Sequence, residues 1–288
     1  MPLWLILALG SVVVLTVSEI AQKFAISSKD NISAEANNFV VWNIQGSLAL
    51  IFLLLFVNPT FPVISITLIL KLLVLAIIYF WGGTLFYTSY KGSSAGLSAI
   101  LGTISTLVST TIGISLFHES INPLKFLGII LVLLAIFIVK YSKEMKFDKY
   151  NLYALAGGLI FGVAFSLDKY FVLSLDPHLY QIIFCFSIGY IGLLFRGKKI
   201  ITDIPKISFS SFKAMIVSGI FSFGFNKFTF LAYKNGGEVG RIDAINNLSL
   251  LFIVLLEYFI LKNKTDLPKK MIAAIVAFSG LFILGYFK

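Results

Sequence analysis

Residues 68–90 read LILKLLVLAIIYFWGGTLFYTSY, and Lys71 is the one charged side chain in this run of 23 residues. A helix needs about 20 apolar residues to cross the hydrocarbon core of a bilayer. The run is therefore long enough for a membrane-spanning helix. It is also continuously apolar, whereas a membrane-spanning strand alternates apolar and polar residues over about ten positions. This stretch predicts an all-α integral membrane protein.

The composition of the whole chain supports the same class. Of its 288 residues, 58% are hydrophobic and 12% are charged, and the mean hydropathy is +0.96. A soluble domain has about one quarter charged residues, so this surface is suited to lipid. The first apolar run has no basic segment before it and contains Glu19, which favours a membrane span over a signal peptide.

Ten runs meet the length requirement, and the loops between them are too short to hold a soluble domain. Any activity therefore lies within or between the helices. The expected spans are residues 3–27, 38–57, 68–90, 93–117, 124–141, 150–173, 178–196, 210–234, 238–262 and 267–287.

The chain contains an internal repeat. Residues 90–100 read YKGSSAGLSAI and residues 233–245 read YKNGGEVGRIDAI, each with a Gly-xxx-Gly pattern. A weaker match joins QKFAIS at 22–27 to DKYFVLS at 168–174. The repeat predicts two five-helix halves, 1–147 and 148–288. Because five is odd, two halves of the same fold must have inverted topologies, an arrangement found in alternating-access carriers.

The net charge of +10 comes mainly from lysines near the loops. Loops that follow odd-numbered spans hold fifteen Lys and Arg residues, against four in the even loops and the termini. The positive-inside rule places the odd loops in the cytoplasm and both termini outside. We interpret these lysines as topology signals and as contacts to anionic lipid headgroups. The expected location is the cell (inner) membrane, and we expect no nucleic-acid binding.

Inserting a charged side chain at the centre of a membrane span costs about 2.5–3.5 kcal/mol of free energy. Such residues therefore usually face the protein interior or a water-filled cavity. Four basic and four acidic residues of this kind predict a net-neutral polar cavity, suited to a zwitterion or a small polar metabolite. The eight are Glu19, Lys23, Asp168, Lys169, Lys227, Arg241, Asp243 and Glu257. The candidate substrate-binding residues are Lys227, Asn226, Arg241, Asp243, Asn246, Glu19, Lys23, Asp168, Lys169, Tyr87 and Trp81.

For several of these residues, a structural role is an alternative to substrate binding. Glu19 and Lys23 share a helix face and can pair with each other. Lys169 can extend to the interface, and Arg241 can bind either a substrate anion or a lipid phosphate. Glu19 and Asp168 are candidates for proton coupling.

The strongest local resemblance lies in the first half. LFHES at 116–120 and PLKFLGIILVLLA at 123–135, together with ten spans in two halves, resemble the EamA-type branch of the drug/metabolite transporter superfamily. The corresponding turn of the second half, LKNKTD at 261–266, lacks the glutamate. The resemblance implies a small-solute carrier with a cavity lined by both halves. It also implies cytoplasmic termini, opposite to the lysine distribution, and it does not specify a substrate.

The leading functional hypothesis is a secondary active transporter or exchanger for an amino acid or similar polar solute. Its expected partners are the solute and the bilayer, with protons as the candidate coupling ion, and the chain is expected to be a monomer or homodimer. One alternative is a flippase for a lipid-linked substrate. Another is a membrane enzyme, but no carboxylate cluster, zinc motif or phosphate loop is present. We therefore predict no catalytic residue, no cofactor and no metal centre, and Cys185, His118 and His178 lack ligand spacing.

Overall fold

The computed structural model describes residues 1–27, 30, 32–57, 65–120, 122–140, 148–262 and 267–286. All elements in these ranges are helices, and no strand is found in them. The elements are α1 (Leu3–Ile26), α2 (Ala34–Phe56), α3 (Ile66–Ser89), α4 (Ala95–Gly102), α5 (Ile104–Phe117), α6 (Pro123–Lys140), α7 (Lys149–Ser174), α8 (Pro177–Asp203), the 3₁₀ helix η1 (Ile204–Lys206), α9 (Phe209–Lys234), α10 (Val239–Asn247), α11 (Ser249–Ile260) and α12 (Leu267–Tyr286).

These helices confirm the predicted fold class. In the described ranges, nine helical stretches are long and apolar enough to cross a membrane; α4 with α5 forms one of them, and α10 with α11 another. The remaining predicted span, 124–141, corresponds to α6, which has 18 residues. The chain is thus a multi-pass integral membrane protein.

The largest boundary difference is at α8, which was expected to end near residue 196. The backbone of Arg196 leaves helical geometry there, with φ −135° and ψ 22°, and the helix then resumes to Asp203. The resumed segment is polar because it meets the start of α2, where Lys199 pairs with Glu35 at 2.8 Å. A hydrophobicity criterion ends a span at such charges, although the helix itself continues.

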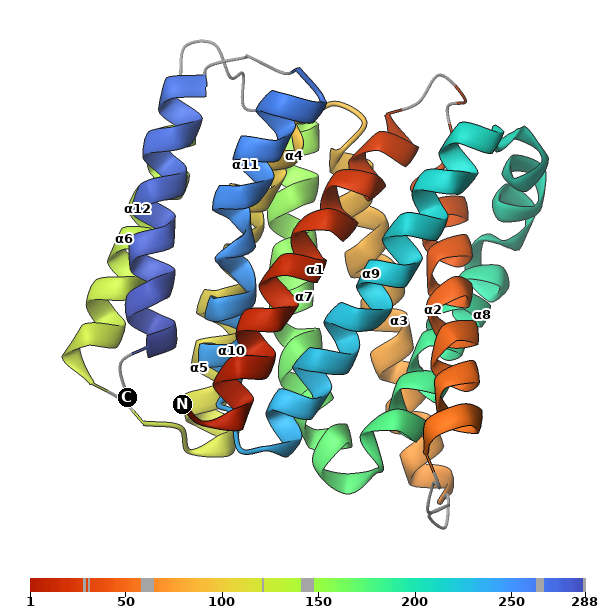
Figure 1. Cartoon of the computed structure of the whole chain (residues 1–288), viewed down its shortest axis with the longest axis horizontal. Coiled ribbons are helices and arrows are strands. Elements are labelled where there is room, and N and C mark those ends of the chain that lie inside the picture. Colours follow the sequence, from red (N-terminus) through yellow and green to blue (C-terminus); the bar gives the residue numbers. More distant parts are fainter. Residues whose placement is uncertain are drawn as a thin grey trace.

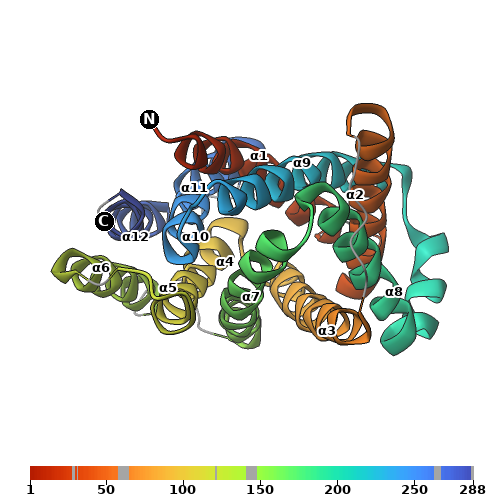
Figure 2. The same ribbon diagram turned by 90° about the horizontal axis from the view of Figure 1, so that it is seen from below.

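The helices of the two halves interleave. Seen end-on, α1 and α9 lie along one long side and α3 and α7 along the other, while α6 with α12 and α2 with α8 close the two ends (Figure 2). Each of these four pairs joins one helix from each half. Figure 1 shows α4 beside α11 in the upper part and α5 beside α10 in the lower part. The broken spans thus run in opposite directions, as inverted repeats require.

Both broken spans are interrupted in the same way. At Thr103 and at Leu248 the backbone has φ −59° with ψ −12° and −20°, respectively. Around each residue the amides bond three residues back, as in a short 3₁₀ turn: Thr103 N to Ile100 O at 3.3 Å and Leu248 N to Ile245 O at 2.9 Å. A 3₁₀ stretch inside a helix often marks a functional site.

Helix α7 approaches the first of these breaks closely because its facing side is glycine. A Cβ added at Gly158 would lie 2.9 Å from Gly102 O, and one at Gly162 would lie 2.5 Å from Ser105 O. Small residues at helix interfaces permit such backbone contact inside a membrane. The glycines of α7 therefore determine how near the broken span lies to the centre of the molecule.

We expect Gly162→Ala to destabilise the protein by about 1–3 kcal/mol, because its methyl group would overlap a backbone oxygen that cannot rotate away. Thermal unfolding in detergent would measure the loss. Gly197→Ala is the matched control, since an added Cβ there meets nothing within 4 Å. Equal stability of the two variants would show that α7 can move away from α5 without penalty.

Candidate functional site

A cavity lies between the two halves. It has a volume of about 100 Å³. Its described lining residues come from both halves and are Leu15, Glu19, Trp42, Gln45, Tyr79, Phe86, Tyr87, Ala99, Gly102, Ser105, Gly158, Phe161, Phe165, Ser222, Phe225, Asn226, Asp243, Asn246, Asn247, Ser249, Leu250 and Ile253.

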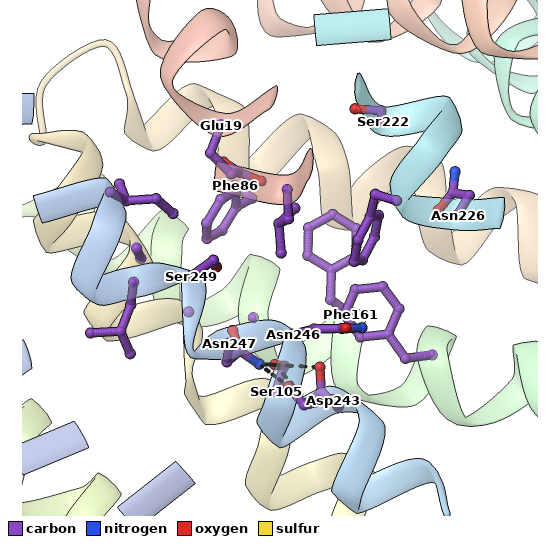
Figure 3. Close-up of a pocket in the computed structure, with 18 of the residues that line it drawn as sticks. Glu19, Phe86, Ser105, Phe161, Ser222, Asn226, Asp243, Asn246, Asn247 and Ser249 are labelled. Atoms are coloured by element: carbon purple, nitrogen blue, oxygen red, sulfur yellow. Dashed lines mark hydrogen bonds between the residues drawn. The ribbon is translucent and has the colours of Figure 1, made fainter. Parts of the chain in front are cut away.

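The two helix breaks open onto this cavity. Gly102 and Ser105 flank the break at Thr103, while Asn247 and Ser249 flank the break at Leu248. Figure 3 shows Asn246, Asn247 and Ser105 grouped with Asp243 at one side of the cavity. In membrane carriers, substrate and ion sites are commonly built at such discontinuous helices, because their ends offer polar backbone groups.

Glu19 lies on the α1 side of the cavity, apart from the Asp243 group (Figure 3). Its carboxylate accepts a hydrogen bond from the Tyr90 hydroxyl. Glu19 is only partly buried, while the Tyr90 ring is fully buried. The tyrosine therefore fixes one oxygen of the carboxylate and leaves the group available to a solute.

The second charged group of the lining is Asp243 of α10. Its Oδ2 accepts from Ser105 Oγ at 3.1 Å and from Ser109 Oγ at 2.9 Å, and its Oδ1 accepts from Asn247 Nδ2 at 3.1 Å. The residue is 1% exposed. Asp243 is thus held by neutral donors from α5 and α10, one broken span from each half.

Amide groups form another part of the wall. Asn226 Nδ2 donates to Gln45 Oε1 at 2.7 Å, linking α9 to α2. Asn246 accepts from Ser11 Oγ and donates through Nδ2 to Thr229 Oγ1 at 3.3 Å. These amides tie α10 to α1 and α9, and they offer both donors and acceptors.

Aromatic rings cover much of the remaining surface. Trp42 and Tyr79 pack edge to face at 5.9 Å, and Phe161 stacks on Phe165 at 5.5 Å. Figure 3 shows Phe86 and Phe161 with their rings toward the cavity. The face of an aromatic ring carries partial negative charge. This wall therefore attracts cations as well as apolar groups.

Asp168 lies behind this wall. Its carboxylate accepts from the hydroxyls of Tyr79 and Tyr180, the latter at 2.5 Å, and the residue is 1% exposed. Tyr79 lines the cavity, while Asp168 is outside the lining. Asp168 therefore orients an aromatic residue of the wall and is separated from a solute by that ring.

The structure thus brings together five of the eleven residues proposed from sequence. Glu19, Tyr87, Asn226, Asp243 and Asn246 line the cavity. The other six lie outside its described lining: Lys227, Arg241, Lys23, Asp168, Lys169 and Trp81.

The basic candidates contact other groups. Lys227 Nζ lies 2.7 Å from His178 Nδ1 and 4.5 Å from the centre of the Phe52 ring. Arg241 is placed over the ring of Trp4 at 4.6 Å. At the other end of α1, Lys23 Nζ donates to the carbonyl oxygens of Tyr90 and Ser93, the latter at 2.7 Å, and to no carboxylate in the described ranges.

The charge of the cavity consequently differs from the expected balance. Within the described lining, Glu19 and Asp243 are the charged residues, and no Lys or Arg is present. The four basic residues inside spans are directed to backbone oxygens, aromatic rings, His178 and Glu119. Counting charges along the spans cannot predict this, because adjacent residues of a helix point about 100° apart.

Sequence reasoning did not propose several small polar residues of the lining. Gln45, Ser105, Ser222, Asn247 and Ser249 all contribute to the cavity. A signal was present in the fourth span, where Ser105 and Ser109 are four residues apart and so share a helix face. The functional meaning of that face depends on Asp243, which is distant in sequence.

Two glutamates outside the cavity connect the broken spans reciprocally. Glu119, just after α5, accepts from the N–H groups of Val239 at 2.6 Å and Gly240 at 3.3 Å, at the start of α10. Lys169 Nζ binds the same carboxylate at 3.1 Å. A carboxylate at a helix N-terminus is stabilised by free N–H groups and the helix dipole.

Glu257 of α11 does the same for the start of α4. It accepts from the N–H groups of Ala95 at 3.1 Å and Gly96 at 2.9 Å, with Lys270 Nζ at 3.7 Å. The second half was expected to lack a counterpart of Glu119 because its turn at 261–266 has no glutamate. The counterpart lies earlier in the sequence, inside α11, and is 1% exposed.

Comparisons with known proteins agree with this architecture. The model of the EamA-like transporter family matches the chain twice, over residues 2–141 and 148–286. Among solved structures, one described only as a crystal structure of a protein superposes with a TM-score of 0.71 over 96% of this chain and 99% of that chain. At 14% identity this likeness shows the fold alone. No curated protein matches the sequence.

Proposed function

Because this chain belongs to the EamA-like transporter family, we propose that it is a secondary active transporter for a small organic solute that carries a protonated amine. Alternating access would expose the central cavity to one side of the membrane and then to the other. The solute class includes amines and amino acids. The proposed location is the cell membrane.

The observation that carries the proposal is the charge of the cavity. Its described lining contains two carboxylates and no basic side chain. A carboxylate in a place of low dielectric constant attracts a cation more strongly than it does in water. Glu19 is only partly buried, and a protonated amine at this position would neutralise it while making charge-assisted hydrogen bonds.

The rest of the lining suits the body of such a solute. Phe86, Phe161 and Phe165 offer apolar faces that also favour a cation. The amides of Gln45, Asn226 and Asn246 can bind hydroxyl or carboxyl groups of the solute, since each amide has both donors and acceptors. We propose that a proton replaces the amine on Glu19 during the return step, which would couple transport to protons.

The inverted halves support alternation. The four helix pairs that form the sides and ends each join one helix from each half, so a rocking motion of the halves moves whole helices against one another. The cavity residues then stay near the centre while access changes.

Three probes with the same ring test the solute class: 2-phenylethylamine, phenylalanine and 3-phenylpropionate. They carry an amine, an amine with a carboxylate, and a carboxylate alone. A ligand that binds the folded state raises its melting temperature by mass action. We expect 2-phenylethylamine, and to a lesser degree phenylalanine, to stabilise the purified protein, and 3-phenylpropionate to have no effect.

Counterflow in proteoliposomes then shows whether a binding amine is also transported. A stabilising effect of 3-phenylpropionate that exceeds that of the amine would contradict the proposed recognition. If no soluble amine stabilises the protein, a solute linked to lipid would become the better hypothesis.

A further inference from the structure

We propose that Asp243, together with the side-chain oxygens around it, binds a sodium ion at the edge of the central cavity. The occupancy of this site does not depend on the solute. Its use as a coupling ion rests on the proposed transport function.

The first observation is the density of oxygen atoms around the carboxylate. Ser105 Oγ and Ser109 Oγ hydrogen-bond to the Asp243 carboxylate, and Asn247 bonds to it through its amide. Asn247 Nδ2 also lies 3.1 Å from Ser105 Oγ and 3.0 Å from Thr106 Oγ1. One carboxylate, three hydroxyls and an amide therefore converge within one helical turn of α5 and of α10. Hard cations prefer oxygen ligands of these kinds.

The second observation is that, in the part of the chain that the structure describes, the hydrogen-bond partners of the Asp243 carboxylate are all neutral. Burial of a carboxylate without a positive partner is costly. The two glutamates that cap the broken spans differ in this respect, because Glu119 is paired with Lys169 and Glu257 with Lys270. A cation at Asp243 would supply the compensation that lysines supply at those two residues.

The hydrogen atoms of this cluster can be rearranged to admit a cation. Ser109 Oγ lies 3.2 Å from the carbonyl oxygen of Thr106, so its proton has a second acceptor and its lone pairs can face the ion. Hydroxyl protons rotate readily. The two ends of an amide have nearly the same shape, so a half turn of Asn247 would present its oxygen in place of its nitrogen.

The position in the fold also favours a cation. Asn247 is the last residue of α10, and Ser105 lies just after the break that ends α4. The breaks that end α4 and α10 thus both lie close to the cluster. Ser105, Asp243 and Asn247 all line the cavity, so an ion can reach the site from it.

Asp168 shows why Asp243 is the better site. Asp168 is equally buried and also has neutral partners, but these are the hydroxyls of Tyr79 and Tyr180. Two aromatic rings provide few further oxygens, and Asp168 is outside the cavity lining. Around Asp243 the oxygens belong to short side chains with close spacing, which favours a small ion such as Na⁺ over K⁺.

Thermal unfolding of the purified full-length protein tests the proposal without any solute. NaCl would be titrated against KCl at constant ionic strength. We expect the melting temperature to rise as Na⁺ replaces K⁺. Mass action requires this shift to grow with the logarithm of Na⁺ concentration once the site is mostly occupied.

Two variants locate the ion. Asp243→Asn should lose the Na⁺ response completely. Ser109→Ala should weaken the apparent Na⁺ affinity by at least about tenfold, the lower end of what supporting groups of a metal site contribute. Ser115→Ala on the same helix is the matched control, because its exposed hydroxyl bonds only the carbonyl oxygen of Ile112. If Asp243→Asn does not fold, Ser109→Ala and Ser115→Ala still decide the question.

Equal melting temperatures in Na⁺ and K⁺ would overturn the sodium site, and so would an unchanged Na⁺ response in Ser109→Ala. Amine binding measured in KCl without Na⁺ separates the two proposals. A protein that responds to 2-phenylethylamine but not to Na⁺ retains the proposed function and loses the ion site, and the opposite pattern retains the ion site alone.

Discussion

Glu19→Gln is expected to weaken amine binding by roughly 10- to 100-fold, while leaving the protein folded. The glutamine keeps the shape of the side chain and an oxygen that can accept from Tyr90, so the buried tyrosine stays satisfied. Only the charge is lost, and a hydrogen bond to a charged group contributes about 1.5–3 kcal/mol. Binding of 2-phenylethylamine, followed by thermal shift or by isothermal calorimetry, measures the change.

Lys227→Gln provides the comparison for this prediction. It neutralises an ionisable residue of the same bundle that contacts His178 and Phe52 and lies outside the cavity lining. We expect its amine affinity to be close to that of the wild type. If Glu19→Gln binds the amine normally and Lys227→Gln does not, the binding site lies on the α8–α9 side and the central cavity is not the amine site.

The membrane spans could be predicted because their cause is local. A run of about 20 apolar residues must lie in lipid wherever its neighbours are, and the observed helices start and end close to the expected positions. The continuation of α8 beyond Arg196 is different. That segment contacts the start of α2, where Lys199 pairs with Glu35, and this contact joins residues far apart in sequence.

The breaks at Thr103 and Leu248 were also not predictable from sequence. No proline marks either position, and Leu248 has no glycine beside it. Both breaks are short 3₁₀ turns in spans that cross the centre of the molecule beside their counterparts from the other half. Their similarity follows from the repeat, and the repeat was detected in the sequence without any indication that the two spans were interrupted.

The candidate site was predicted in part, and the reason lies in helix geometry. Asn226 faces the cavity while the next residue, Lys227, reaches His178. Asp243 faces the cavity, while Arg241, two positions earlier, covers Trp4. Polar residues inside apolar spans could be recognised, but which of two neighbours faces inward depends on the packing of the other helices.

Glu119→Ala is expected to destabilise the protein by about 3–5 kcal/mol, the range found when one partner of a buried ion pair is removed. The change leaves Lys169 without its carboxylate and the N–H groups of Val239 and Gly240 without an acceptor. Equilibrium unfolding in detergent would measure the loss. Because the inverted halves repeat the arrangement, Glu257→Ala should have a similar effect through Ala95 and Gly96.

Two further variants separate charge from capping at Glu119. Glu119→Gln keeps an oxygen for the helix N-terminus and should recover part of the loss. Lys169→Met in the Glu119→Ala background removes the unpaired cation and should recover another part, as expected for coupled neighbours. Glu238→Ala changes a glutamate at the same helix start that makes no capping bond with its side chain, and it should cost much less.

The reciprocal placement of these two glutamates has a consequence for transport. Glu119 joins the end of α5 to the start of α10, and Glu257 joins the end of α11 to the start of α4, at opposite ends of the broken spans (Figure 1). Each cap therefore joins a residue of one half to a helix of the other, at the end of a broken span and away from the break in its middle. If the caps hold the broken spans together as one unit during rocking, Glu119→Gln and Glu257→Gln should slow transport more than they weaken amine binding. A loss of binding equal to the loss of transport would instead mean that the caps only stabilise the folded protein.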